Sequence, residues 1–294
     1  MKNIYFGFIA IFLLPSAISA QESRLVDAEW LQKRMGKGNL VIFHIGREED
    51  YQKEHIDGAI YLAPSEYTYD DDVRVFDLPT DEVLKDLFES KGVSNNKDVV
   101  IYTPKNWIPL VTRLYFTLDY LGHGSKTYIL DGGLVAWKAI DGDVSERAPE
   151  LVKRSFDIKP NINLLADKQE VLASIEDENV DIVDCRAQVY YTAIEATHGA
   201  RKGRVPGAKT IPYTTLYQET DIGAYKFKTL DEIAEIFESQ KLKKNQDIVL
   251  YCHIGMQLTV VYTAAKLLGY EKVKMYDGSF REWGPDETLP IEID

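Results

Sequence analysis

The sequence predicts an α/β protein of two tandem domains, each a mostly parallel sheet with helices on both faces. Three observations support this: the length of 294 residues, a long internal repeat, and short apolar runs that alternate with helical stretches. The length exceeds what one hydrophobic core usually fills, and the repeat is too long for a solenoid unit. Each copy should therefore hold its own core.

The repeat is visible without inserting a gap over its best segment. FESKGVSNNKDVVIYT (Phe88–Thr103) aligns with FESQKLKKNQDIVLYC (Phe237–Cys252). Two further pairs agree, Leu121–Trp137 with Leu268–Trp283, differing in length by one residue, and His55–Ala59 with Arg204–Ala208. Self-similarity of this kind indicates two copies of one fold.

The apolar runs are continuous rather than alternating, which is typical of parallel strands buried on both faces. The strands expected from them are Leu40–Phe43, Val99–Tyr102, Ile248–Tyr251 and Val273–Tyr276. Helices that supply the crossovers are expected at Thr80–Ser90, Lys168–Glu176 and Thr229–Ser239. A polar stretch within residues 139–164 predicts the linker. We place the first domain at 21–145, the linker at 146–164 and the second domain at 165–294.

The N-terminus is predicted to be a signal peptide, residues 1–20. Lys2 precedes the apolar run Ile4–Leu14, and small residues follow up to Ala20. A membrane anchor is the alternative, but about eleven apolar residues are fewer than the ~20 that span a bilayer. We expect export, to a periplasm or outside the cell, and no stable membrane insertion.

The net charge of −13 argues against nucleic-acid partners and anionic membranes. The five histidines are scattered, with no two at ligand spacing on one helix, so no metal site is expected.

Cys252 is the residue that points to chemistry. It follows the strand DIVLY, and after a short loop the helical pattern TVVYTAAKLLG begins. The unpaired N–H groups at that helix start would favour a thiolate, the nucleophilic form, and would also hold an anion. Cysteine phosphatases place an arginine six residues after the cysteine, whereas this chain has Leu258. Without that forked phosphate partner, sulfur transfer is the better interpretation.

Four ordered motifs resemble the rhodanese family, the thiosulfate and 3-mercaptopyruvate sulfurtransferases. They are Asp184-Cys185-Arg186, Gly203-Arg204-Val205-Pro206-Gly207-Ala208, Cys252-His253-Ile254-Gly255-Met256-Gln257 and Tyr276-Asp277-Gly278-Ser279-Phe280-Arg281-Glu282-Trp283. The resemblance implies two tandem rhodanese-like domains, of which the second is catalytic. In the first, Thr103 stands at the place of Cys252, Pro104 interrupts the loop N–H groups, and His44-Ile45-Gly46 replaces Asp184-Cys185-Arg186. A hydroxyl does not replace a thiolate here, so the first domain is expected to be non-catalytic.

The resemblance implies a double displacement through a persulfide. The Cys252 thiolate takes the outer sulfur of thiosulfate or 3-mercaptopyruvate and passes it to a thiol or cyanide, without a cofactor. The substrate-binding residues expected are Arg186, Arg201, His253, Ile254, Gly255, Met256 and Gln257. Arg186 is the first choice for the cation that meets the anionic donor, with Arg201, Lys202 and Arg204 as further candidates. His253 would help only when protonated, and a role as a solvent-facing loop residue is equally open.

The other cysteine, Cys185, is expected to be a small buried core residue. If Arg186 points towards the active loop, as the resemblance implies, strand alternation turns Cys185 to the opposite side, away from Cys252. Two other classes of function remain open: a non-catalytic binding module, and a thiol-exchange protein in which Cys252 pairs with a second thiol. A reducing protein partner is also compatible with the persulfide route.

Overall fold

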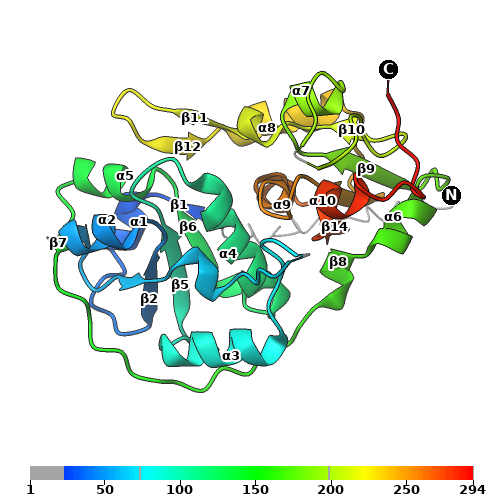
Figure 1. Cartoon of the computed structure of the whole chain (residues 1–294). Coiled ribbons are helices and arrows are strands. Elements are labelled where there is room, and N and C mark those ends of the chain that lie inside the picture. Colours follow the sequence, from blue (N-terminus) through cyan, green and yellow to red (C-terminus); the bar gives the residue numbers. More distant parts are fainter. Residues whose placement is uncertain (1–22, 73, 198, 294) are drawn as a thin grey trace, which may run out of the picture.

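Short, mostly apolar runs form two five-stranded parallel sheets (Figure 1). The chain is described by a computed structural model over residues 23–72, 74–197 and 199–293. The predicted signal peptide, residues 1–20, lies outside these described residues. The first sheet has the order β1-β6-β5-β2-β4, and the second, read in the same direction, β8-β14-β13-β9-β10. The two orders are equivalent, so the two copies of the repeat share one topology.

The strands of the first sheet are β1 (Leu25–Val26), β2 (Leu40–His44), β4 (Ile60–Tyr61), β5 (Asp98–Tyr102) and β6 (Thr127–Leu130). Those of the second are β8 (Leu165–Ala166), β9 (Val180–Asp184), β10 (Lys209–Thr210), β13 (Asp247–Tyr251) and β14 (Val273–Tyr276). Two small antiparallel pairs lie outside the sheets, β3 (His55–Ile56) with β7 (Val144–Ser145), and β11 (Tyr217–Glu219) with β12 (Tyr225–Phe227).

The helices of the first domain are α1 (Ala28–Gln32), α2 (Glu48–Lys53), α3 (Asp81–Ser90), α4 (Ile108–Tyr120) and α5 (Gly133–Ala139). Those of the second are α6 (Lys168–Ser174), α7 (Gln188–Tyr191), α8 (Leu230–Ser239), α9 (Leu258–Leu267) and α10 (Ser279–Trp283). Short 3₁₀ turns are η1 (Pro64–Glu66), η2 (Gly124–Lys126), η3 (Ile162–Leu164) and η4 (Tyr213–Leu216). None of the described helices is long and apolar enough to cross a membrane.

Both faces of each sheet are covered, as the fold class predicts. Along β2, Val41 and Phe43 belong to one hydrophobic core and Ile42 belongs to another. Helices α3 and α4 cover the first face, whereas α1 and α5 cover the second. The predicted α/β fold of two like domains is therefore confirmed.

The element boundaries follow local capping. The side chain of Thr80 caps α3, and Thr229 forms a capping box with Glu232 at the start of α8, so both helices begin one residue later than predicted. Helix α6 ends at Ser174 instead of Glu176. The predicted linker, 146–164, has no helix or strand over residues 146–161, but its buried Phe156 donates its backbone N–H to Glu89 of α3 (3.0 Å). The segment is thus fastened along the first domain.

The two domains share one hydrophobic core between α4 and α9. A single cluster of buried side chains contains Phe43 and Phe116 of the first domain and Tyr262 and Leu250 of the second. The rings of Phe116 and Tyr262 meet edge to face with 4.9 Å between centroids. Figure 1 shows α4 and α9 side by side between the two sheets. The domains are therefore expected to unfold together.

Replacing Phe116 by Ala should lower the free energy of unfolding by about 3–5 kcal/mol, because a large ring is lost from the shared core. Denaturant unfolding followed by circular dichroism measures the loss. Hydrogen exchange should accelerate in both β5 and β13, since both sheets border this core. Val83→Ala on the exposed face of α3 is the control and should change stability by no more than about 0.5 kcal/mol. Faster exchange in β5 alone would contradict a shared core.

Candidate active site

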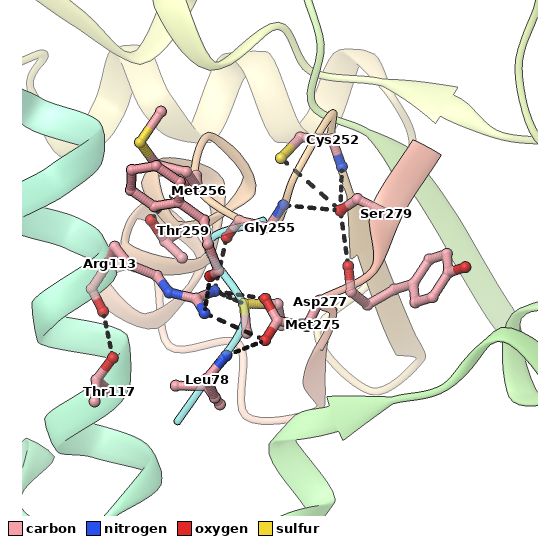
Figure 2. Close-up of polar contacts among 12 residues, drawn as sticks. Leu78, Arg113, Thr117, Cys252, Gly255, Met256, Thr259, Met275, Asp277 and Ser279 are labelled. Carbon is pink, nitrogen blue, oxygen red and sulfur yellow. Dashed lines mark hydrogen bonds and ion pairs between the residues drawn. The ribbon is translucent and has the colours of Figure 1, made fainter. Parts of the chain in front are cut away.

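Cys252 lies at the carboxyl end of β13, where the sequence predicts it, and its side chain is completely buried. The loop that follows leads to α9, which begins at Leu258 with Gln257 as its N-cap residue. The sulfur lies 3.9 Å from the hydroxyl of Ser279 (Figure 2). The thiol therefore sits inside the protein at a helix start, where unpaired N–H groups favour negative charge.

Ser279 holds the first half of this loop. Its hydroxyl oxygen accepts hydrogen bonds from the N–H of Cys252 (3.1 Å) and of Gly255 (3.2 Å), and the hydroxyl donates to the carbonyl of Tyr276 (2.8 Å). The next residue, Phe280, donates its N–H to the Cys252 carbonyl (3.0 Å). The start of α10 thus fixes both peptide groups of Cys252.

Gly255 is required by space and by backbone conformation. Its φ is +77°, and an added Cβ would lie 2.2 Å from Oδ1 of Asp277 and 2.8 Å from the Asp277 carbonyl. No side chain fits there, and only glycine adopts this φ without strain. The loop therefore packs directly onto Asp277.

His253 is neutral near neutral pH. Burial is the main reason that its pKa is lowered to about 4, and the positive charge of Arg186 lowers it further, against the opposing effect of Asp184. Its Nδ1 hydrogen-bonds the hydroxyl of Thr197 (2.6 Å), and its ring meets Tyr190 edge-on. His253 therefore brings no positive charge to the site at pH 7.

Arg186 is buried and already has an anion as its partner. Its Nε and Nη2 donate to the two carboxylate oxygens of Asp184 (3.0 and 2.6 Å), and Nη2 also donates to the Gly203 carbonyl. The guanidinium lies 3.8 Å from the ring centre of Phe280. This motif forms an internal ion pair beside the site.

Arg201 is committed to the C-terminal segment. Its guanidinium donates to the carbonyls of Gly284 (2.8 Å), Asp286 (2.5 Å) and Leu289 (3.1 Å). Arg204 pairs with Glu292. Both arginines thus contact the C-terminal segment, and their predicted role in binding a donor stays a prediction.

The expected placement of Cys185 is wrong in its direction. Cys185 belongs to the same core as Cys252, whereas Arg186 stacks on the opposite side against Phe280. Arg186 extends towards Asp184 and Phe280, and strand alternation then leaves Cys185 on the Cys252 face. Both cysteines are free, and burial raises the pKa of Cys185 well above its ordinary value. The expectation of a buried core residue is confirmed.

Sequence reasoning missed the roles of three residues around the Cys252 loop. The pKa of Tyr213, in η4, is raised chiefly by burial and further by nearby Cys252, against the opposing effect of the Gln257 side chain. Ser279 stood within a quoted motif, but its role as a common acceptor requires the fold. Arg113 of the first domain reaches the loop from α4. Only a local signal, the serine after Asp277-Gly278, was available in advance.

Replacing Ser279 by Ala should destabilise the protein by about 1–3 kcal/mol for each of the two buried N–H groups left without an acceptor. Chemical denaturation measures this loss. Ser239→Ala on the exposed surface of α8 is the matched control, and its change should stay within about 0.5 kcal/mol. Equal stability of the two variants would show that Ser279 does not hold the loop.

The imidazole of His253 should titrate with a midpoint near its pKa of about 4, measured by NMR. The folded pKa lies below the ordinary value of 6.5, so the unfolded chain binds the proton first as the pH falls. The neutral His253 ring contributes its full stabilisation of the folded protein above pH 6.5, and this contribution is lost as the pH falls towards 4. His253→Gln should reduce this acid sensitivity, although His44, with a pKa also lowered to about 4 by burial, keeps its own share. A His253 midpoint near 6.5 would contradict the buried neutral ring.

Known proteins agree with this geometry. The sequence model of the rhodanese-like domain family matches this chain twice, at residues 27–140 and at residues 167–286. The chain is 28% identical to the 3-mercaptopyruvate sulfurtransferase of Escherichia coli K12, over 91% of this chain and 97% of the relative. It is 29% identical to the thiosulfate sulfurtransferase of Corynebacterium glutamicum, over 93% of this chain and 91% of the relative.

Solved structures show the same fold. An EanB variant in complex with ergothioneine has a TM-score of 0.81 at 21% identity, over 93% of this chain and 70% of that one. YnjE has a TM-score of 0.78, also at 21% identity, over 92% and 68%. The sequence relatives support a general sulfurtransferase function. With two matched segments that together cover most of its length, the chain belongs to the family of proteins with rhodanese-like domains.

Proposed function

We propose that the protein transfers a sulfane sulfur from thiosulfate or 3-mercaptopyruvate to a thiol or cyanide, with the sulfur carried as a persulfide on Cys252. The observation that carries the proposal is the position of Cys252, buried at the end of β13 in a loop fixed by Ser279 and followed by the N-terminus of α9. The equivalent residue of the first domain is Thr103, which lacks a thiol.

The proposed first half-reaction forms one S–S bond. The Cys252 thiolate attacks the outer sulfur of thiosulfate, the S–S bond of the donor breaks, and sulfite leaves with the electron pair. With 3-mercaptopyruvate the C–S bond breaks instead, and the leaving carbon takes a proton to give pyruvate. In the second half-reaction a thiolate or cyanide attacks the outer sulfur of the persulfide and the Cys252 thiolate is restored. Electrons and atoms balance without a cofactor.

An anionic donor would be held by backbone groups of the loop. His253 is neutral at pH 7, and Arg186 is paired with Asp184. Within the described part of the chain, the N–H groups of Ile254, Met256 and Gln257 have no hydrogen-bond acceptor. These groups, together with the dipole of α9, are the donors available to a developing negative charge. A reducing protein could take the sulfur in place of a small thiol.

Intact mass spectrometry tests the proposal on the reduced protein after exposure to thiosulfate and, separately, to 3-mercaptopyruvate. We expect a gain of one sulfur atom that cyanide removes, and the donor that reacts faster identifies the substrate. The gain should vanish in Cys252→Ser and persist in Cys185→Ala, which removes only the second thiol.

Two outcomes would contradict the proposal. If neither donor adds sulfur to the reduced wild-type protein, a non-catalytic binding role becomes the better conclusion. If oxidation joins Cys252 to Cys185 and the Cys185→Ala variant loses all reaction, thiol exchange between the two neighbouring cysteines explains the site better.

A further inference from the structure

Arg113 links the first domain to the loop of Cys252. It lies on α4, and its side chain is completely buried. Its Nη1 donates to Oδ1 of Asp277 (2.7 Å) and to the carbonyl of Gly255 (3.0 Å), and its Nη2 donates to the carbonyl of Phe76 (2.6 Å). Figure 2 shows the Gly255 backbone between this guanidinium and Cys252. A cation of one domain thus contacts the loop of the other.

Asp277 completes the connection. Its Oδ2 accepts the N–H of Leu78 (2.8 Å) from the first domain, while Arg113 contacts both of its carboxylate oxygens. Two residues later in the chain stands Ser279, which accepts the N–H groups of Cys252 and Gly255. A buried guanidinium is costly unless its partners are in place, so this ion pair restricts the position of the loop.

The repeat offers an internal comparison. Asp131 stands six residues before Trp137, as Asp277 stands six residues before Trp283. Asp131 also accepts a backbone N–H from the other domain, that of Phe227 (3.0 Å). The two hydrogen bonds between the domains, from Leu78 to Asp277 and from Phe227 to Asp131, are therefore equivalent, and we call each of them a crossing.

The two crossings differ in that the guanidinium of Arg113 is present at Asp277. Arg113 precedes Leu121 by eight residues, and the residue eight places before Leu268 is Val260. Consistent with this, burial raises the pKa of Asp131 to about 6, and only Lys226 opposes the rise by its charge. The crossing forms at Asp131 without a buried arginine, so domain docking alone does not account for Arg113. The arginine is present only beneath the loop of the nucleophile.

We infer that Arg113 is a positioning residue for the Cys252 loop, supplied by the domain that lacks the nucleophile. In a planar trans peptide the carbonyl of one residue and the N–H of the next point in opposite directions. By holding the Gly255 carbonyl, Arg113 turns the Met256 N–H to the other side of the loop, away from the interface. That group is then available to the sulfur on Cys252. The inference rests on the proposed function, and it deepens it: the catalytic loop is completed by the first domain.

The test uses the full chain with four variants. Arg113→Met removes the cation, Arg113→Met with Asp277→Asn also removes the carboxylate left unpaired, Arg113→Lys restores one charge, and Asp131→Asn is the matched control at the equivalent crossing. Two quantities are measured: hydrogen exchange of the backbone over residues 252–257, and the single-turnover rate of persulfide formation on Cys252.

Both Met variants should exchange faster in residues 252–257 while β5 and β13 keep their protection. The rate of persulfide formation at saturating donor should fall roughly 100-fold, because a small misplacement of reacting groups costs that much. Arg113→Lys should recover part of both quantities. Asp131→Asn should stay within about two-fold of the wild type in both.

The inference is overturned if loop exchange in both Met variants stays within about two-fold of the wild type. It is also overturned if exchange rises equally throughout both sheets, since Arg113 would then serve stability alone. Failure of the proposed function looks different: the wild-type protein takes up no sulfur from either donor, and the exchange measurement still decides whether Arg113 positions the loop.

Discussion

The contact between α4 and α9 is the constraint on which the rest of the molecule depends. At its centre the hydroxyls of Thr112 and Thr259 lie 2.8 Å apart, completely buried. These residues are equivalent in the repeat, each nine residues before the aligned leucine that follows, so an approximate twofold axis passes between them. Each hydroxyl also lies within hydrogen-bonding distance of a backbone carbonyl near it in the chain, that of Ile108 for Thr112 (3.1 Å) and that of Met256 for Thr259 (2.6 Å). The two helices therefore meet here without leaving a buried hydroxyl unpaired. The next residue along α4 is Arg113, and its reach to Gly255 follows from this arrangement.

Divergence from the shared fold is concentrated around one loop. Gly133 of the first domain has nearly the same φ as Ser279 of the second, +52° and +50°. An added Cβ at Gly133 would lie 2.1 Å from the Thr103 carbonyl, so the first domain has no room for a serine there. It lacks the thiol, the hydroxyl that gathers the loop N–H groups, and the buried cation beneath them. The second domain has all three, the last of them from its neighbour.

The sequence was sufficient for the fold because its signals are local and repeated. Apolar runs mark the strands, Thr80 and Thr229 mark helix starts, and the aligned segments Phe88–Thr103 and Phe237–Cys252 imply one topology for both halves. Partner choice is not local. From the sequence, Arg186 is a candidate cation for the substrate, whereas in the fold it pairs with Asp184. Nothing near Arg113 in the sequence predicts its contact with Gly255. The predicted side of Cys185 was wrong because it was derived from the direction assumed for Arg186.

The electrostatics of the site follow from how its cations are used. Arg186 and Arg113 are each neutralised by an aspartate, and His253 is kept neutral by burial. A net charge of −13 further opposes an anionic donor at a distance. Stabilisation of such a donor then falls to oriented backbone N–H groups, whose strength depends on the shape of the loop. Buried charge in this protein thus contributes to chemistry indirectly, through Asp277, Ser279 and the Gly255 peptide, by holding that shape.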